Sequence, residues 1–85
     1  MPSRRARSHD PRAEEIAAAL RSAGLTALPD RNGRACVDVY QAGTDLAEAM
    51  PYEIVAYFDL EPFEALDNRG IAEEILRQMG TYLRF

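Results

Sequence analysis

The sequence predicts a single small α+β domain in which two helices pack on one face of a three-stranded, mainly antiparallel sheet. Three observations predict this class. A chain of 85 residues with 47% hydrophobic residues is typical of one small globular core. Two segments, residues 11–23 and 68–79, place apolar side chains at helical spacing. Between them lie shorter apolar stretches with turn residues and period-two alternation, as expected for half-buried strands. The expected order is helix, strand, strand, short helix, strand, helix.

The first nine residues are predicted to form a flexible basic arm, and residues 10–85 the folded domain. The arm has no apolar periodicity and holds Arg4, Arg5 and Arg7 together with the only histidine, His9. Residues 1–12 carry a net charge of +3 and residues 13–85 a net charge of −7, within a total of −4. The folded part is therefore more acidic than the whole chain.

The first helix has clear signals at both ends. Asp10 suits the N-cap and Pro11 the first helical position, while Gly24 suits the position just beyond the end. One apolar stripe runs along this helix and consists of Ala13, Ile16, Ala17 and Leu20. A stripe of this kind must pack against another element.

A hairpin is predicted to follow the first helix. Asn32 and Gly33 separate two apolar stretches, as in a two-residue type I′ turn. Because Pro29 has no N–H to donate to a neighbouring strand, the first strand is expected at the sheet edge. Cys36 is expected to be a small buried apolar residue. The turn fixes a register that puts four residues on one side of the sheet: Thr26, Leu28, Val37 and Val39.

The segment from residue 44 to 60 is predicted to contain a short helix and the third strand. Thr44 is the expected cap of a helical segment at 45–50 that Pro51 ends, with Leu46, Ala49 and Met50 facing inward. The strand is expected over residues 52–60. Its core phase consists of Tyr52, Ile54, Ala56, Phe58 and Leu60, and its outward phase of Glu53, Val55, Tyr57 and Asp59.

The last helix is expected to end at Gly80, with an apolar tail beyond it. Its stripe consists of Ile71, Ile75, Leu76 and Met79. With both helices on one sheet face, the other face is left open to water or to a partner. We also expect a homodimer, because a core of this size gives marginal stability and the tail adds apolar surface.

The inventory of reactive side chains argues against an enzyme. One histidine lies in the arm and one cysteine in a strand, so no Ser-His-Asp or Cys-His set is available within the domain. The glycines form no phosphate-binding motif, and the acidic residues form no calcium-loop pattern. We therefore predict no catalytic site, no cofactor and no metal. The chain lacks an apolar run of about 20 residues and a signal-peptide core, so the cytoplasm is the expected compartment.

The strongest pattern is a partition of charge. Residues 35–68 hold eight carboxylates and no Arg, Lys or His, although the chain has ten arginines. Tyrosines among carboxylates suit an arginine-rich protein surface, because carboxylates pair with guanidinium groups and the rings offer cation–π faces. The predicted partner-binding surface consists of Asp38, Tyr40, Asp45, Glu48, Glu53, Tyr57, Asp59 and Glu61.

The sequence thus predicts a small non-enzymatic protein-binding module that engages a basic partner surface. It would act as a nucleic-acid-mimicking inhibitor of a nuclease-type effector, or as an antitoxin or immunity protein. Three alternatives stay open. In the first, the chain is a fragment or a subunit that completes a larger active site. The other two concern binding and solubility. The acidic surface serves solubility alone, or the chain binds nucleic acid through Arg4, Arg5 and Arg7. The order helix, three strands, helix also occurs in double-stranded-RNA-binding domains, but the last helix here lacks their phosphate-binding lysines.

Overall fold

The computed structural model describes residues 9–83, with side chains described as far as Gly80. The elements are α1 (Pro11–Ser22), β1 (Ala27–Pro29), β2 (Cys36–Tyr40), the 3₁₀ turns η2 (Leu46–Glu48) and η3 (Pro51–Glu53), β3 (Ile54–Asp59), the 3₁₀ turn η4 (Glu61–Phe63) and α2 (Asn68–Leu83). The three strands form one antiparallel sheet in the order β1-β2-β3. The predicted α+β class and element order are confirmed. None of the helices in this range is long and apolar enough to cross a membrane.

Helix α1 begins and ends where the sequence predicts. The Asp10 carboxylate accepts hydrogen bonds from the backbone N–H groups of Arg12, at 2.9 Å, and Ala13, at 3.1 Å. Gly24 ends the helical region with a φ of +103°, which residues with a Cβ rarely adopt. These two caps determine where the helix begins and ends, and its apolar stripe is buried in the core.

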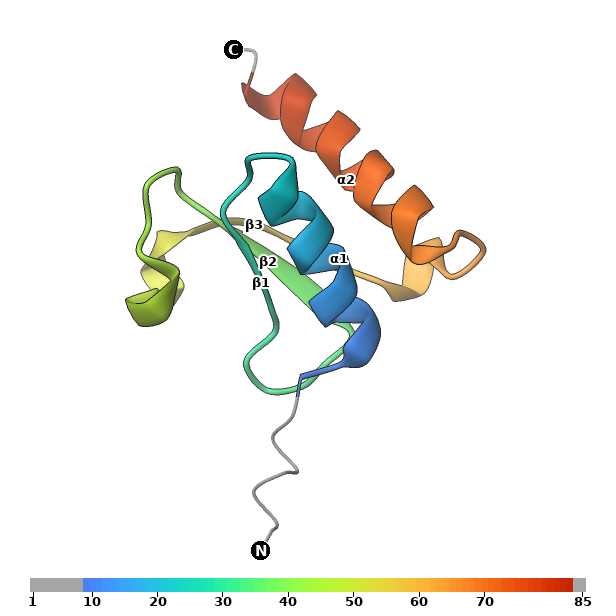
Figure 1. Cartoon of the computed structure of the whole chain (residues 1–85), viewed down its shortest axis with the longest axis horizontal. Helices are drawn as coiled ribbons and strands as arrows, with labels where there is room; N and C mark the ends of the chain where they lie inside the picture. Colours follow the sequence, from blue (N-terminus) through green and yellow to red (C-terminus); the bar gives the residue numbers. More distant parts are fainter. Residues whose placement is uncertain (1–8, 84–85) are drawn as a thin grey trace, which may run out of the picture.

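One apolar core joins both helices to one face of the sheet. In Figure 1, α1 lies in front of β1 and β2, and α2 runs beside α1. Helices of this length are stabilised mainly by burying such a stripe rather than by intrinsic propensity. The core cluster contains Ala13, Ile16, Ala17 and Leu20 from α1, Ala27, Val37 and Val39 from the sheet, Leu60, and Ile71, Ala72, Ile75 and Met79 from α2.

The hairpin between β1 and β2 differs from the prediction. No residue other than glycine has a positive φ in the described range, so Asn32 is not in a type I′ turn. The turn instead starts at Asp30, whose carbonyl accepts the N–H of Gly33 at 3.1 Å. The Asp30 carboxylate also accepts the N–H groups of Asn32, at 3.0 Å, and Arg34, at 3.2 Å. Aspartate is favoured at the first position of such a turn because it makes these bonds.

The longer turn shifts the predicted register of β1 by one residue. Ala27 lies opposite Val39, Leu28 opposite Asp38 and Pro29 opposite Val37. A shift of one residue exchanges the two faces of a strand. Ala27 is therefore fully buried in the core, and the prediction that Thr26 and Leu28 share a side of the sheet with Val37 and Val39 is wrong. The prediction that β1 is an edge strand is confirmed.

A bulge between β2 and β3 corrects the prediction for the third strand. Val39 lies opposite Ala56, but Tyr40 lies opposite Ile54, so Val55 is the extra residue. Ile54 consequently lies outside the core cluster, contrary to the prediction, while Ala56 and Phe58 pack against it. Val55 instead borders the helix side of the sheet, in a hollow that it shares with Val39 and other residues.

Three further boundaries were predicted wrongly. Tyr52 lies in η3 and is 79% exposed, because Pro51 starts a 3₁₀ turn before β3 begins. Met50 is exposed rather than inward, and Asp45, not Thr44, caps the short segment before it. Helix α2 runs through Gly80 to Leu83. A single glycine within a helix costs only about 1 kcal/mol relative to alanine, so it does not have to end one.

Candidate binding site on the open face of the sheet

The central strand β2 is buried on both faces, although the helices cover only one. All five of its residues are buried. Val37 and Val39 belong to the core, so strand alternation directs Cys36, Asp38 and Tyr40 to the face opposite the helices. These three residues are 2%, 9% and 5% exposed. Their burial has a different source from that of the core.

Loop residues surround these three side chains and form a hollow on the open face of the sheet. The hollow has a volume of about 510 Å³, within the usual range of ligand sites. The β1–β2 loop borders it on one side, and Pro51 with Ile54 on the other. The lining consists of Asp30, Arg31, Asn32, Arg34, Cys36, Asp38, Tyr40, Pro51, Ile54, Tyr57 and Asp59.

Asp38 lies at the centre of β2 with little to balance its charge. It is 9% exposed, and within residues 9–83 no ion pair includes it. Its hydrogen-bond donor is the Cys36 thiol, with Sγ 4.0 Å from Oδ1, a long and weak contact. Burial, followed by the charge of Asp30, raises the pKa of Asp38, and the smaller opposing influence of Arg34 and Arg31 does not cancel this. The hollow therefore contains a carboxylate whose negative charge is not balanced by an ion-pair partner among the described residues.

The two arginines at the rim are engaged elsewhere. Arg34 Nε lies 3.7 Å from Asp30 Oδ2, and the Arg34 side chain is 72% exposed. Arg31 Nη2 donates to the Ala49 carbonyl at 3.3 Å. Both guanidinium groups therefore border the hollow without pairing with Asp38. Residues 35–68 contain no basic residue, but the surface that they form is not free of basic side chains. The fold brings Arg31 and Arg34 to it.

Cys36 is unsuited to nucleophilic chemistry. It is a free, buried cysteine. Burial, with further contributions from Asp38, Asp59 and Asp30, raises the pKa of its thiol to about 11. The thiolate is the reactive form of cysteine, so at neutral pH this side chain is almost entirely unreactive. The prediction that Cys36 is a small buried residue is confirmed.

Three donor groups in the hollow could ligate a metal ion. One donor atom from each of Asp30, Cys36 and Asp38 lies within 4.8 Å of the others. Carboxylate and thiolate donors together suit zinc-like ions, although Asp30 already accepts two backbone N–H groups and lies next to Arg34. In chemical terms the hollow is suited to a cation, either a metal ion or a cationic side chain.

The structure brings together half of the predicted partner-binding residues. Asp38, Tyr40, Tyr57 and Asp59 all line the hollow. Tyr57 lies opposite Asp38 in the sheet and is 67% exposed, so its ring is available at the surface. The predicted surface therefore has a compact centre built from β2 and β3.

The other predicted residues lie outside this centre. Asp45, Glu48 and Glu53 line a second hollow of about 500 Å³. Two of them also hold turns, because the Asp45 carboxylate accepts the Ala47 N–H at 3.0 Å and that of Glu53 accepts the Met50 N–H at 2.8 Å. Glu61 is exposed in η4 and lines neither hollow. Arg4, Arg5 and Arg7, the alternative nucleic-acid-binding residues, lie outside the described residues.

Sequence reasoning missed several residues of the hollow. Asp30, Arg31 and Arg34 reach it because the turn starts at Asp30, and Ile54 reaches it because of the bulge. The turn had a readable signal, since aspartate followed three positions later by glycine is typical of a type I turn. The bulge had none in the local sequence.

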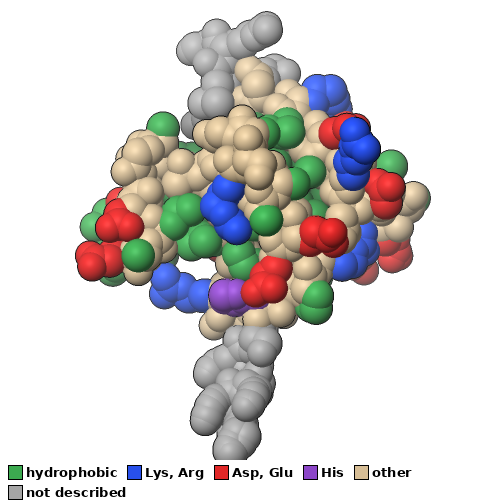
Figure 2. Space-filling view, viewed as in Figure 1, with side chains coloured by type: hydrophobic (Ala, Val, Ile, Leu, Met, Phe, Trp, Pro, Cys, Tyr) green, Lys and Arg blue, Asp and Glu red, His purple; other side chains and the backbone are tan. Residues whose placement is uncertain are grey.

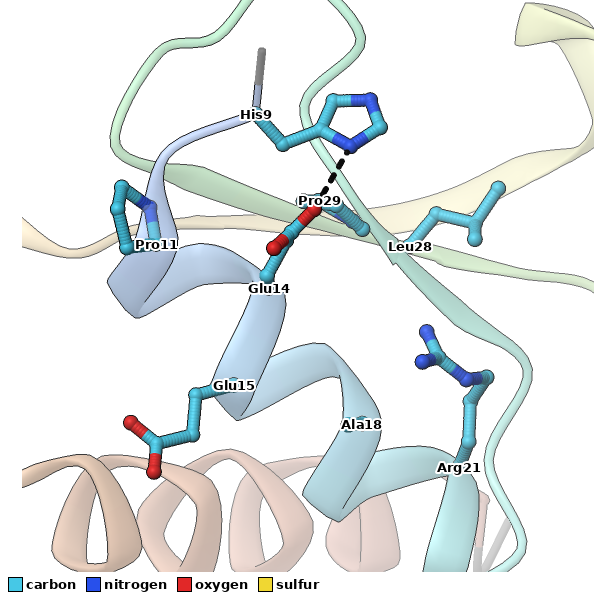
Figure 3. A pocket seen from close by; sticks show the side chains of 8 residues that line it. All are labelled: His9, Pro11, Glu14, Glu15, Ala18, Arg21, Leu28 and Pro29. Atoms are coloured by element: carbon cyan, nitrogen blue, oxygen red, sulfur yellow. Dashed lines mark hydrogen bonds and ion pairs between the residues drawn. The ribbon is translucent and has the colours of Figure 1, made fainter.

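Another hollow lies on the helix side and is a weaker candidate. It has a volume of about 620 Å³ between α1 and β1 (Figure 3). Its charged groups have partners, because His9 Nδ1 lies 3.4 Å from Glu14 Oε2 and Arg21 Nη1 donates to the Ala27 carbonyl at 2.9 Å. Figure 2 shows acidic and basic side chains interspersed on this side of the molecule. These groups therefore already have hydrogen-bond partners within the chain.

Comparison with protein-family models, curated protein sequences and solved structures finds no match. No function is therefore transferred to this chain from another protein.

Proposed function

We propose that this protein is a non-enzymatic binding module whose open sheet face engages a basic surface of a partner protein. The observation that carries the proposal is Asp38, a nearly buried carboxylate without an ion-pair partner among the described residues, at the centre of a hollow on that face. A buried charge is stabilised when a binding partner supplies the opposite charge. A complementary partner therefore gains more from this position than from an exposed carboxylate.

The residues around Asp38 support a protein partner. Tyr57 and Asp59 lie at the exposed part of the same hollow, which combines an aromatic ring with a second carboxylate. Tyrosine is enriched at protein interfaces and at their energetic centres. Basic protein surfaces are often nucleic-acid sites. The module would therefore act as a nucleic-acid-mimicking inhibitor of a nuclease-type effector, or as an antitoxin or immunity protein.

The reactive side chains support a role without catalysis. Cys36 has a strongly raised pKa, and His9 is paired with Glu14 on the helix side, away from the hollow. General acid–base or nucleophilic chemistry needs such groups within reach of one another. These groups therefore support a binding function rather than catalysis.

A comparison of two probes of opposite charge tests the proposed function. The full chain is titrated with an arginine-rich peptide and, separately, with a 20-base-pair DNA duplex at about 50 mM salt, where phosphate contacts are strong. We expect peptide binding and no retardation of the duplex in a gel. A variant with Arg4, Arg5 and Arg7 replaced by Gln separates the arm from the domain. If that variant still retards DNA and fails to bind the peptide, nucleic-acid binding replaces our proposal.

A further inference from the structure

We propose that the hollow at Asp38 receives a single arginine side chain of the partner, whose guanidinium pairs with Asp38 and stacks on Tyr57. This inference rests on the proposed function and names the chemistry that anchors the partner. It assigns the hollow to a guanidinium group rather than to a metal ion or a phosphate.

The position of Asp38 favours an inserted side chain. Its carboxylate is 9% exposed and lines the hollow, so a flat partner surface cannot reach it and an inserted side chain can. The contact from the Cys36 thiol, at 4.0 Å, leaves most of its acceptor capacity unused. A guanidinium group fits this need, because it presents several N–H donors in a fixed fork that matches a carboxylate.

The entrance to the hollow is aromatic and acidic. Tyr57 lies directly across the sheet from Asp38 and keeps two thirds of its surface exposed, at 67%. Asp59 lies on the same strand, opposite Cys36, and adds a second exposed carboxylate. A planar guanidinium stacks on an aromatic face while its edge donates to carboxylates, whereas a lysine ammonium acts as a point charge. The hollow therefore favours arginine over lysine.

The rim of the hollow limits how many cations can enter it. Arg31 and Arg34 border the hollow, and both lower the pKa of Asp38, so their fields reach its carboxylate. They repel an incoming cation, so the hollow itself admits one cationic side chain more readily than several. A single inserted arginine, with the other basic groups of the partner outside the rim, meets the smallest repulsion.

The same rim distinguishes this ligand from a metal ion. Asp30 is the third candidate ligand, but its Oδ2 accepts two backbone N–H groups and lies 3.7 Å from Arg34 Nε. Turning this carboxylate to a metal would break the bonds that shape the turn. An arginine that pairs with Asp38 leaves Asp30 unchanged.

The test is an NMR titration of the full-length chain with three small probes. N-acetyl-arginine amide carries the guanidinium, N-acetyl-lysine amide carries a different cation, and N-acetyl-citrulline amide is a neutral isostere of arginine. We expect saturable shifts at the backbone amides of Cys36, Asp38 and Tyr57 with the arginine probe, weaker shifts with lysine and none with citrulline.

Variants then locate the site. Asp38→Asn should reduce the arginine affinity about tenfold or more, because a charge-assisted pair is lost. Tyr57→Leu should reduce it by a smaller factor. Asp67→Asn, a matched change that lies outside the hollow, should leave the affinity unchanged. Replacing Arg31 and Arg34 by Gln should increase it.

Several results would overturn the inference. If the citrulline probe binds as tightly as the arginine probe, the charge pair is not the basis of recognition. The same conclusion follows if Asp38→Asn does not lower the affinity for the arginine probe. Zn²⁺ binding at micromolar concentration with shifts at the same amides would assign the hollow to a metal. If the arginine probe fails in the hollow while an arginine-rich peptide still binds the open face, the inference fails and the proposed function stands. If both fail, the proposed function fails as well.

Discussion

The two faces of the sheet are closed in different ways. The helix face is covered by α1 and α2, and its apolar side chains form one continuous cluster. Among the described residues no α-helix covers the open face, yet β2 is also buried there, because the β1–β2 loop and the start of β3 border it. On the helix face, the buried side chains are apolar and pack against each other. On the open face, a nearly buried carboxylate has no ion-pair partner among the described residues.

This difference separates the face that stabilises the fold from the face that we propose binds a partner. Apolar burial on the helix side supplies the main driving force of folding. Burial of an unpaired charge opposes folding, so its presence on the open face has no stabilising explanation within residues 9–83. Structural features that cost stability are frequent at functional sites. The following experiments test whether the two faces are separated in this way.

Truncation of a core residue on the helix side should have the largest effect on stability. Ile75 is fully buried in the cluster, so Ile75→Ala should lower the free energy of unfolding by about 2–5 kcal/mol in a denaturant titration. Leu66→Ala is the control, since Leu66 is 43% exposed, and we expect a change of roughly 0.5 kcal/mol or less. Equal effects would mean that the helix face is not the main core.

The thiol of Cys36 tests burial on the open face. With its pKa raised from 9.0 to about 11, the fraction of thiolate at pH 8 should be about 100-fold lower than that of an ordinary cysteine. Alkylation by iodoacetamide should be correspondingly slow in the native protein and fast in denaturant. The native rate should rise with pH until about pH 11. Fast alkylation of the native protein at pH 8 would show that the hollow is open to solvent down to β2.

The turn that forms the wall of the hollow depends on Asp30. Its carboxylate accepts two backbone N–H groups and is itself buried, so Asp30→Ala should destabilise the protein by about 1–3 kcal/mol. Asp45→Ala is a matched control, because Asp45 caps a short exposed turn through a single N–H. If the two variants are equally stable, Asp30 does not determine the conformation of the β1–β2 loop.

The pH dependence of Asp38→Asn should be the smallest effect, and its sign is informative. The pKa of Asp38 is raised in the folded state, so protonation favours folding. The stability that this group contributes is present below its ordinary pKa of 3.8 and is lost as the pH rises through the raised value. Asp38→Asn should therefore be the more stable protein at pH 7, with a difference that shrinks in acid. A less stable variant at pH 7 would mean that the folded chain already supplies a cation to Asp38.

The fold could be predicted because its signals are local. The caps of α1, the apolar stripes of both helices and the alternation of β3 each follow from a few neighbouring residues. The errors arose where pairing between distant segments decides the structure. The turn starts at Asp30 rather than being centred on Asn32 and Gly33. The bulge at Val55, opposite Val39 and Tyr40, depends on contacts across the sheet.

The candidate site was predicted in part for the same reason. Asp38, Tyr40, Tyr57 and Asp59 share one face through strand alternation, which can be read from the sequence. The hollow itself could not be predicted, because it needs the shifted hairpin and the bulge. The sequence also could not show that Asp38 is buried and Asp59 exposed, since both follow the same alternation.

The most direct test compares one charge reversal on each face. Asp59→Lys on the open face and Glu73→Lys on α2 change the net charge by the same amount, and both positions are exposed. Binding of a hexa-arginine peptide to each variant is measured by isothermal titration calorimetry at about 150 mM salt, where long-range attraction is screened beyond roughly 8 Å. We predict a loss of affinity of about tenfold or more for Asp59→Lys and less than about twofold for Glu73→Lys. Equal losses would show that the peptide responds to net charge alone, and would contradict the assignment of binding to the open face.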